Sequence, residues 1–261
     1  MTLQGSWIWY ELMTPDADGS KAFYDRVVGW SIQTTHGDST DYGFINNADG
    51  GMTGGVLHLT NEMCEHGARP CWLGYLGVDD VDASVTAIEA AGGRLLMPAR
   101  DVEMAGRIAM VADPNGAPFY IMTPVPPPGG GESNAFSPTL VGRCAWNELM
   151  AADQQAALDF YTGHFGWSLP EPMDMGAMGQ YQFVAHDGLT TGAIMRKPDQ
   201  APMSAWTHYF RVAEINAAKA AVEAGGGTIM LDVMEVPNGD WIIQGTDPQG
   251  AFFALVGANQ S

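Results

Sequence analysis

The pattern of hydrophobic positions from Trp7 to Met13 predicts an alternating strand. A helical period follows from about Ala17 to Val28, where Ala22, Phe23 and Val27 form one apolar side. Three short apolar segments separated by glycine residues come next and predict three more strands. The pattern therefore predicts a βαβββ module at the start of the chain.

A second module with the same order of elements follows within the first half of the chain. Two glycines, Gly92 and Gly93, end its helix, and a turn of sequence Asp-Pro-Asn-Gly at 113–116 joins its last two strands. In such a turn proline presets one dihedral angle and Asn-Gly accepts a positive φ. The expected elements are a strand near Trp72 to Val78, a helix near Val81 to Ala91, and strands near Arg94 to Met97, Arg107 to Ala112 and Ala117 to Met122.

The second half of the chain repeats the first. The segment WYELM at 9–13 recurs as WNELM at 146–150, and the Asp-Pro-x-Gly-Ala turn that begins at Asp113 recurs from Asp247. The repeat predicts four βαβββ modules, two in each of two domains. A run of prolines and glycines without an apolar residue lies between the halves. This run predicts a first domain at 1–125, a linker at 126–138 and a second domain at 139–261.

The composition restricts the class of partner. The 261 residues carry a formal charge of −19 with only 11 lysine and arginine residues, which argues against nucleic acid and anionic membrane lipids as partners. No apolar segment reaches the roughly 18 residues of a membrane helix, and the first residues do not resemble a signal peptide. The three cysteines show neither zinc-site spacing nor a disulfide framework, so we expect a cytoplasmic protein.

These features resemble the vicinal oxygen chelate superfamily, which includes glyoxalase I, bleomycin and fosfomycin resistance proteins and extradiol dioxygenases. The resemblance rests on the order of elements, the Phe-Tyr and Gly-Trp pairs at the end of the first helix, the Gly-Gly after the second helix, and the Asp-Pro-x-Gly-Ala turn. It covers both halves, and the chain is similar to two-domain glyoxalase-like proteins of bacteria. The resemblance implies an α+β fold of two tandem glyoxalase-like domains, each of two βαβββ modules that form a curved mixed sheet around a cavity.

The resemblance also implies positions for metal ligands, and the residues at these positions are poor ligands. Trp9 and Trp146 occupy the first-strand position, where an indole ring has no lone pair to offer. Tyr120 and Ala254 occupy the eighth-strand position, where metal enzymes carry a carboxylate. His58, at the fourth-strand position, is the one plausible donor, and a single donor does not hold a catalytic metal. We therefore expect no metal and no other cofactor.

Two glutamates are the leading polar candidates. Because side chains alternate along a strand, Glu11 shares a face with Trp9, and Glu148 shares the equivalent face with Trp146. A carboxylate in an aromatic pocket needs a partner or a raised pKa, since desolvation disfavours the charged form. Each glutamate is therefore either a polar anchor or general base for a substrate, or a structural hydrogen-bond acceptor. The sequence leaves both roles open.

Aromatic residues and one histidine complete the predicted sites. We expect Glu11, His58 and Tyr120 to converge in the first half for metal-independent acid–base chemistry of the isomerase or lyase type. The residues expected to bind the substrate are Trp9, Trp72, Tyr75, Trp146, Glu148, Trp206 and Tyr209.

The predicted function is the binding of a small hydrophobic or aromatic organic molecule in an interior cavity, with this acid–base chemistry. The alternative is a non-catalytic binding protein, in the manner of drug-sequestering proteins that resemble this fold. A metal-dependent glyoxalase or dioxygenase would require ligands that the sequence lacks. The chain is expected to be either a monomer with intramolecular domain pairing or a homodimer.

Overall fold

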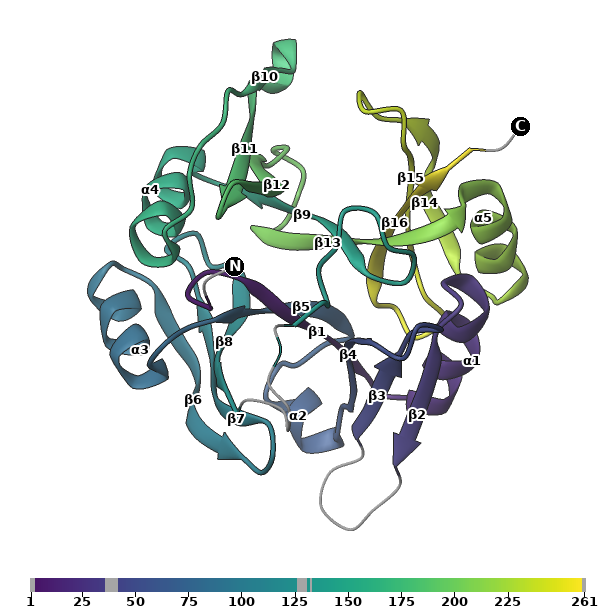
Figure 1. Cartoon of the computed structure of the whole chain (residues 1–261), viewed down its shortest axis with the longest axis horizontal. Coiled ribbons are helices and arrows are strands. Elements are labelled where there is room, and N and C mark those ends of the chain that lie inside the picture. The colour runs from purple at the N-terminus through teal and green to yellow at the C-terminus, as the bar shows by residue number, and fades with distance from the viewer. Residues whose placement is uncertain (1–2, 36–41, 126–130, 132, 260–261) are drawn as a thin grey trace. The chain divides into compact units, whose positions relative to one another are not determined.

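The computed structural model describes residues 3–35, 42–125, 131 and 133–259 (Figure 1). Part of the predicted linker, 126–130 and 132, lies outside the described residues. In each half of the chain, hydrogen bonds join eight strands into one mixed sheet, and neither sheet closes into a barrel. The predicted α+β fold of four βαβββ modules is confirmed.

The two halves have matching elements in matching sheet order. The first sheet has the order β2-β3-β4-β1-β5-β8-β7-β6, and the second has β10-β11-β12-β9-β13-β16-β15-β14. The first half comprises β1 (Trp7–Thr14), α1 (Ala17–Val27), β2 (Ser31–Thr35), β3 (Tyr42–Asn46), β4 (Met52–His58), α2 (Asn61–Glu65), β5 (Cys71–Gly77), α3 (Val81–Ala90), β6 (Arg94–Val102), β7 (Gly106–Ala112) and β8 (Pro118–Pro124). The second half comprises β9 (Cys144–Ala151), α4 (Gln154–Phe165), β10 (Met173–Asp174), a 3-10 turn (Gly176–Met178), β11 (Gln180–His186), β12 (Leu189–Arg196), β13 (Ala205–Glu214), α5 (Ile215–Ala224), β14 (Thr228–Glu235), β15 (Trp241–Thr246) and β16 (Phe252–Ala258).

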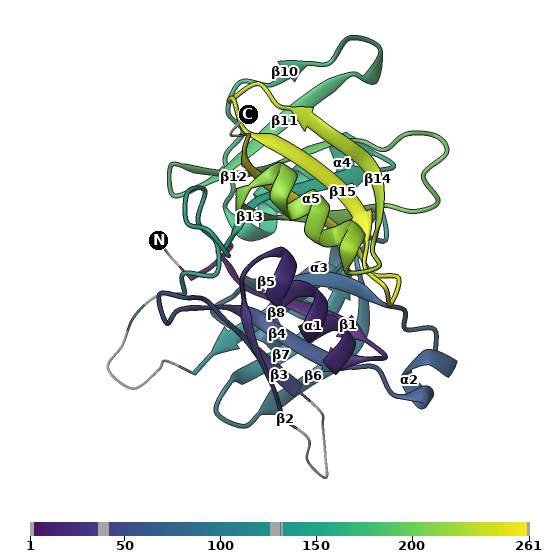
Figure 2. The same ribbon diagram turned by 90° about the vertical axis from the view of Figure 1, so that its right-hand side faces the viewer.

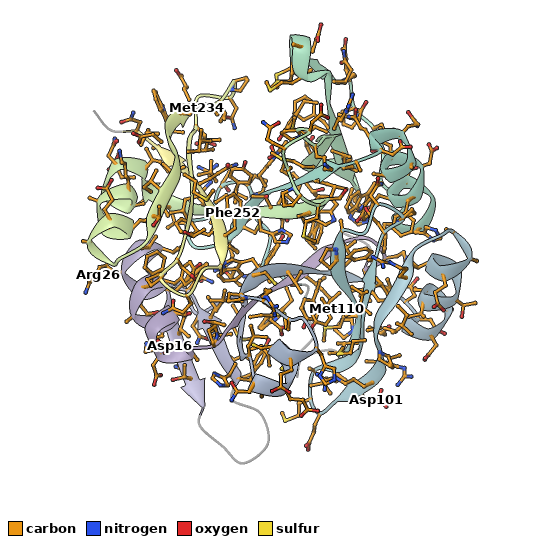
Figure 3. All side chains as sticks on the ribbon, turned by 180° about the vertical axis from the view of Figure 1, so that it is seen from behind. Asp16, Arg26, Asp101, Met110, Met234 and Phe252 are labelled. Atoms are coloured by element: carbon orange, nitrogen blue, oxygen red, sulfur yellow. The ribbon has the colours of Figure 1, made fainter. Side chains whose placement is uncertain are left out.

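The first helix of each half begins at an aspartate in the same repeated position. The side chain of Asp16, labelled in Figure 3, accepts a hydrogen bond from the backbone N–H of Gly19, and Asp153 caps α4 in the same way. Helix α4 ends at Gly166, whose φ of 65° is a left-handed conformation that glycine adopts without strain. Within the described part of the chain, no helix is long and apolar enough to cross a membrane.

The described residues form two compact units, and each unit combines one module of the first half with one module of the second. Unit 1 takes its residues from Met1–Ile8, Gly74–Ser133 and Asn147–Thr207. Unit 2 takes its residues from Trp9–Leu73, Asn134–Trp146 and His208–Ser261. Helix α3 packs against α4 in unit 1, and α1 packs against α5 in unit 2, where Figure 2 shows the two helices side by side. The predicted domain boundaries at 1–125 and 139–261 remain a prediction.

A hydrogen-bonded network of tryptophan, tyrosine and aspartate lies in the core of unit 2. The indole N–H of Trp72 donates to the Tyr24 hydroxyl at 3.0 Å, and that hydroxyl donates to Oδ2 of Asp247 at 3.1 Å. Burial raises the pKa of Tyr24 well above its ordinary value, and the negative charge of Asp247 adds to this effect. The hydroxyl therefore keeps its proton at neutral pH and remains a donor.

Unit 1 contains the same network, built from the repeated residues. The indole N–H of Trp206 donates to the Tyr161 hydroxyl at 2.8 Å, and the hydroxyl donates to Oδ2 of Asp113 at 3.3 Å. In both units the tyrosine comes from the first helix of one half and the aspartate from the turn of the other half. The repeated Phe-Tyr and Asp-Pro motifs thus hold together modules that are distant in sequence.

Candidate functional site

The second half contains a carboxylate and a phenol in hydrogen-bond contact, of which the carboxylate is buried. Glu148 on β9 is 7% exposed, and its Oε2 accepts a hydrogen bond of 2.7 Å from the hydroxyl of Tyr181 on β11. The ring of Phe183, two residues further along β11, meets the Tyr181 ring edge to face at 5.6 Å between centroids. A carboxylate and a phenol in hydrogen-bond contact can accept and donate a proton, or can bind a hydroxyl or carbonyl oxygen of a ligand.

The first half has the corresponding residues at the corresponding strand positions. Glu11 on β1 is 3% exposed and pairs across the sheet with Gly55 on β4, as Glu148 pairs with Ala193 on β12. Tyr42 begins β3, just as Tyr181 lies near the start of β11. The hydroxyl of Tyr42 occupies the space where a side chain on Gly55 would stand. The glutamate and the tyrosine hydroxyl therefore lie over neighbouring strands on one face of the sheet.

The predicted ligand-binding residue Trp9 belongs to this group. Its indole N–H donates to the Tyr42 hydroxyl at 2.9 Å, and its ring meets Phe44 edge to face at 6.4 Å between centroids. Trp9 is partly exposed. In this bond the Tyr42 hydroxyl oxygen is the acceptor. The hydroxyl can therefore still donate its own hydrogen to another acceptor.

A thiol lies close to the Glu11 carboxylate. Burial raises the pKa of Cys71 to about 12, and the negative charge of Glu11 contributes to that shift. The thiol is therefore protonated at neutral pH and is a poor nucleophile.

The structure does not bring His58 together with Glu11. His58 ends β4 and pairs with Thr14, whereas Glu11 pairs with Gly55, three residues earlier on the same strand. Because side chains alternate along a strand, an odd separation places His58 on the opposite face of the sheet from Glu11. The hydroxyl of Thr14, its pairing partner, bonds to the hydroxyl of Ser20 in α1 at 2.8 Å, which identifies this face as the helix-covered one.

The predicted residues Tyr75 and Tyr120 lie together in unit 1. They pair across β5 and β8, each is 4% exposed, and their rings stack at 4.3 Å between centroids with an interplanar angle of 12°. The equivalent residues of the second half are Tyr209 and Ala254, which pair across β13 and β16 in unit 2. There the side-chain amide of Gln244 donates to the Tyr209 hydroxyl at 2.7 Å.

Three of the predicted binding tryptophans occupy core or partly buried positions. Trp72 and Trp206 are 6% and 7% exposed, and their indole N–H groups serve the two core networks. A structural role accounts for both. Trp146 is partly buried and packs against a cluster that includes Tyr209 and Ala254.

Sequence reasoning missed Tyr42, Tyr181 and Gln244. The two tyrosines belong to a further repeat in the sequence, Tyr-x-Phe at 42–44 and at 181–183, and this repeat is the signal that could have identified them. Gln244 has no repeated signal, because the first half carries Met110 at its position. Only the folded sheet places the Gln244 amide next to the Tyr209 hydroxyl.

Acidification is expected to destabilise the protein through His208, which also was not predicted. His208 is 2% exposed and its ring lies edge to face against Tyr10 at 5.0 Å, and burial lowers its pKa to about 3. Below the unfolded pKa of roughly 6.5 only the unfolded chain takes up this proton, so stability is lost as the pH falls toward 3. At pH 5 the loss is about 2 kcal/mol.

Urea unfolding at pH 7.5 and pH 5.0 measures this effect when the wild type is compared with His208→Phe. The variant is expected to lose about 2 kcal/mol less than the wild type between the two pH values. His66→Phe, at an exposed histidine, is the control and should behave as the wild type. An equal loss in His208→Phe and the wild type would contradict the assignment.

The donor set does not fit a metal centre. Across residues 3–35, 42–125, 131 and 133–259, no group of three or more His, Cys, Asp or Glu side chains is placed to hold a metal ion. Tryptophan stands at both first-strand ligand positions. A zinc or similar transition-metal centre in a protein is built from three or more converging donors of the N, O or S type. We therefore derive no chemical step through a metal.

Comparisons with known proteins give a consistent family. A family model described as the Glyoxalase/Bleomycin resistance protein/Dioxygenase superfamily matches residues 8–121 and 141–255. Over 97% of its length the chain is 29% identical to "Putative glyoxylase CFP32" of Mycobacterium tuberculosis, covering 95% of that protein. Over 97% of its length it is 30% identical to "Anthracycline biosynthesis protein DnrV" of Streptomyces peucetius, covering 93% of that protein.

Solved structures show the same fold. The Mn(II)-bound glyoxalase from Novosphingobium aromaticivorans has a TM-score of 0.65 and 16% identity, over 98% of this chain and 83% of that one. The 2,3-dioxygenase LapB from Pseudomonas sp. KL28 has a TM-score of 0.63 and 12% identity, over 99% of this chain and 94% of that one. At these identities the likeness concerns the fold alone.

Proposed function

Since the chain belongs to the glyoxalase/bleomycin resistance protein/dioxygenase superfamily, we propose that it binds a small aromatic organic molecule through its buried glutamates and the aromatic side chains near them. The observation that carries the proposal is the hydrogen bond between Tyr181 and the buried Glu148. Burial of a carboxylate is costly unless the group is hydrogen-bonded or paired, and both halves nevertheless retain the buried glutamate. A phenol and a carboxylate side by side suit a ligand with hydroxyl or carbonyl oxygens.

The relatives support an aromatic ligand class. Two similar proteins, from Streptomyces peucetius and Streptomyces sp. strain C5, are named for anthracycline biosynthesis. Anthracyclines are planar polycyclic compounds with quinone and phenol oxygens, which match aromatic walls and a carboxylate–phenol pair in chemical character. We therefore propose a planar hydroxyquinone as the type of ligand.

The chemistry that we propose at this site is acid–base chemistry without a metal. A glutamate serves as the base and a tyrosine hydroxyl as the acid, as Glu148 and Tyr181 are arranged, and Glu11 has the same position in the first half. His58 has no part in this proposal, since it lies on the other face of the sheet. The alternative is a protein that binds the ligand without converting it. Mass spectrometry after incubation distinguishes the two, because a protein that only binds the ligand returns it unchanged. We also propose a cytoplasmic location, because Cys64, Cys71 and Cys144 are all free thiols.

Replacement of the glutamate tests the proposal. Quinizarin, a planar dihydroxyquinone, is expected to quench tryptophan fluorescence of the wild type, and Glu148→Gln is expected to weaken its binding tenfold or more, because hydrogen bonds to charged groups contribute about 1.5–3 kcal/mol. Glu11→Gln makes the same test in the first half. Glu171→Gln, at an exposed glutamate, is the matched control and should bind as the wild type.

Thermal unfolding of the same variants separates a functional from a structural carboxylate. A functional glutamate gives weaker binding with little change in melting temperature. If both Glu11→Gln and Glu148→Gln bind quinizarin as the wild type does but melt at lower temperature, the carboxylates are structural and the proposal is wrong.

A further inference from the structure

We propose that the protein is modified spontaneously at Asn238, whose side-chain amide is lost by reaction with the backbone nitrogen of Gly239. The sequence contains the dipeptide Asn-Gly twice, at 115–116 and at 238–239. Both dipeptides lie in turns of the same backbone geometry, but their side chains have different surroundings. This difference predicts that the asparagine at 238 reacts and the one at 115 is protected, whatever ligand the protein binds.

The two turns have the same backbone. In each, a proline precedes the asparagine and the glycine. The N–H of Gly116 donates to the carbonyl oxygen of Asp113 at 2.9 Å. In the second turn the N–H of Gly239 donates to the carbonyl oxygen of Val236, also at 2.9 Å. The φ angles of the two glycines are 87° and 84°, in the left-handed region that glycine adopts without strain. The backbone therefore favours neither asparagine.

The side chain of Asn115 is held from outside its turn. Its amide N–H donates to the backbone carbonyl oxygen of Asp153 at 3.1 Å, and its Oδ1 accepts from the backbone N–H of Asp153 at 2.7 Å. Asp153 is itself fixed, because its side chain caps helix α4 through the N–H of Ala156. Both polar ends of the amide are thus bound to a helix terminus. Reaction at Asn115 first requires both bonds to break.

The printed hydrogen bonds of the Asn238 side chain stay within the loop that joins β14 and β15. Its amide donates to Oδ2 of Asp240 at 3.2 Å, and its Oδ1 accepts from the backbone N–H of Asp240 at 3.1 Å. Asn238 and Gly239 are exposed, whereas Asn115 and Gly116 are partly buried. A Cβ atom added to Gly239 would meet no atom within 4 Å. Water therefore reaches this amide, and a short exposed loop opens at lower cost than a turn bound to a helix.

The reaction takes place within the chain. The backbone nitrogen of Gly239 gives its proton to water and forms a bond to Cγ of Asn238, which closes a succinimide ring. The bond between Cγ and the side-chain nitrogen breaks, and this nitrogen takes up a proton and leaves as ammonia. Water then opens the ring at one of its two carbonyl carbons and gives aspartate or isoaspartate. Glycine permits the attack because it has no Cβ atom to hinder the approach.

The product changes the charges of the loop. In the unmodified protein Asp240 accepts hydrogen bonds from Arg211 at 3.1 Å and 2.6 Å, besides the one from the Asn238 amide. A carboxylate at position 238 has no N–H to donate, and it places a like charge beside Asp240. Isoaspartate also lengthens the backbone between β14 and β15. The modified chain thus carries one more negative charge, which chromatography can detect.

Peptide mapping of the full chain by tandem mass spectrometry tests the inference. Under mildly alkaline conditions the folded protein is expected to form aspartate and isoaspartate at position 238 about tenfold faster or more than at 115, because the bonds to Asp153 must open first. The chain unfolded in guanidinium chloride should react at both positions at similar rates, since both are Pro-Asn-Gly.

Two results would overturn the inference. One is a rate at 238 in the folded protein that is equal to or lower than the rate at 115. The other is a difference between the two positions that persists in the unfolded chain, because the fold would then not be its cause.

Two variants make the test through charge. In Asn238→Gln the amide lies further from the backbone and ring closure is slower, so this variant should not form the acidic species that ion-exchange chromatography detects in aged wild type. Asn61→Gln, at an exposed asparagine followed by glutamate, is the matched control and should form that species as the wild type does. Equal accumulation of the acidic species in Asn238→Gln would place the reaction at another residue and contradict the inference.

Discussion

Replacement of Gly192 by alanine is expected to lower the free energy of unfolding by about 3 kcal/mol, at the upper end of what overpacking costs. Gly192 on β12 pairs with Asn147 on β9, and a Cβ atom added to Gly192 would overlap the carbonyl oxygen of Asn147. The overlapping atoms belong to the backbone of a paired strand. They cannot move apart without opening the pairing between β9 and β12.

The first half predicts the same result at its equivalent position. Gly54 on β4 pairs with Tyr10 on β1, and a Cβ atom on Gly54 would overlap the Tyr10 carbonyl oxygen. Gly54→Ala should therefore be destabilising to a similar degree. The repeated glycine thus serves the close approach of two strands rather than the approach of a ligand.

Urea unfolding of Gly192→Ala and Gly54→Ala measures both effects, with Gly163→Ala as the matched control. Gly163 lies in α4, is exposed, and has no atom within 4 Å of an added Cβ. Because glycine inside a helix is less favourable than alanine, Gly163→Ala should raise the free energy of unfolding by about 0.5–1 kcal/mol. A midpoint for Gly192→Ala equal to that of the wild type would show that the strands accept the extra atom.

The fold could be predicted because its signals are local and occur twice. Alternation over Trp7 to Met13, the helix after Asp16 and the turn at Asp113 are all short-range patterns, and each recurs in the second half. Short-range patterns determine the elements and their order. The grouping of modules into units could not be predicted in this way. It goes with long-range contacts such as the hydrogen bond between Tyr24 and Asp247, and nothing in the sequence near either residue identifies the other as its partner.

The candidate site was predictable only in part, and strand register is the physical reason. The shared face of Glu11 with Trp9, and of Glu148 with Trp146, follows from period-two alternation, and both glutamates are buried. The face of His58 depends on how β4 pairs with β1, and a difference of one residue turns a side chain to the other face. The contact between Gln244 and Tyr209 depends on two strand pairings at once. Such contacts need the register of the whole sheet.

Removal of the Tyr161 hydroxyl is expected to lower the free energy of unfolding by about 2–4 kcal/mol. Tyr161→Phe leaves the indole N–H of Trp206 without its acceptor and Oδ2 of Asp113 without its donor. Each buried polar group that loses its partner costs about 1–3 kcal/mol. Asp113 keeps the hydrogen bond that its Oδ1 accepts from the backbone N–H of Ala117, so the turn itself should persist.

Double-mutant cycles then test which aspartate accepts the hydrogen bond of the Tyr161 hydroxyl. Tyr161→Phe combined with Asp113→Asn should show a coupling energy of about 1 kcal/mol or more, because the two side chains share a buried hydrogen bond. Tyr161→Phe combined with Asp247→Asn should be additive within about 0.5 kcal/mol, since Asp247 serves Tyr24. The two aspartates occupy equivalent turns, so each cycle is the control for the other. Coupling to Asp247 in place of Asp113 would mean that each half is held together by its own residues, and that the exchange of modules between the halves is wrong.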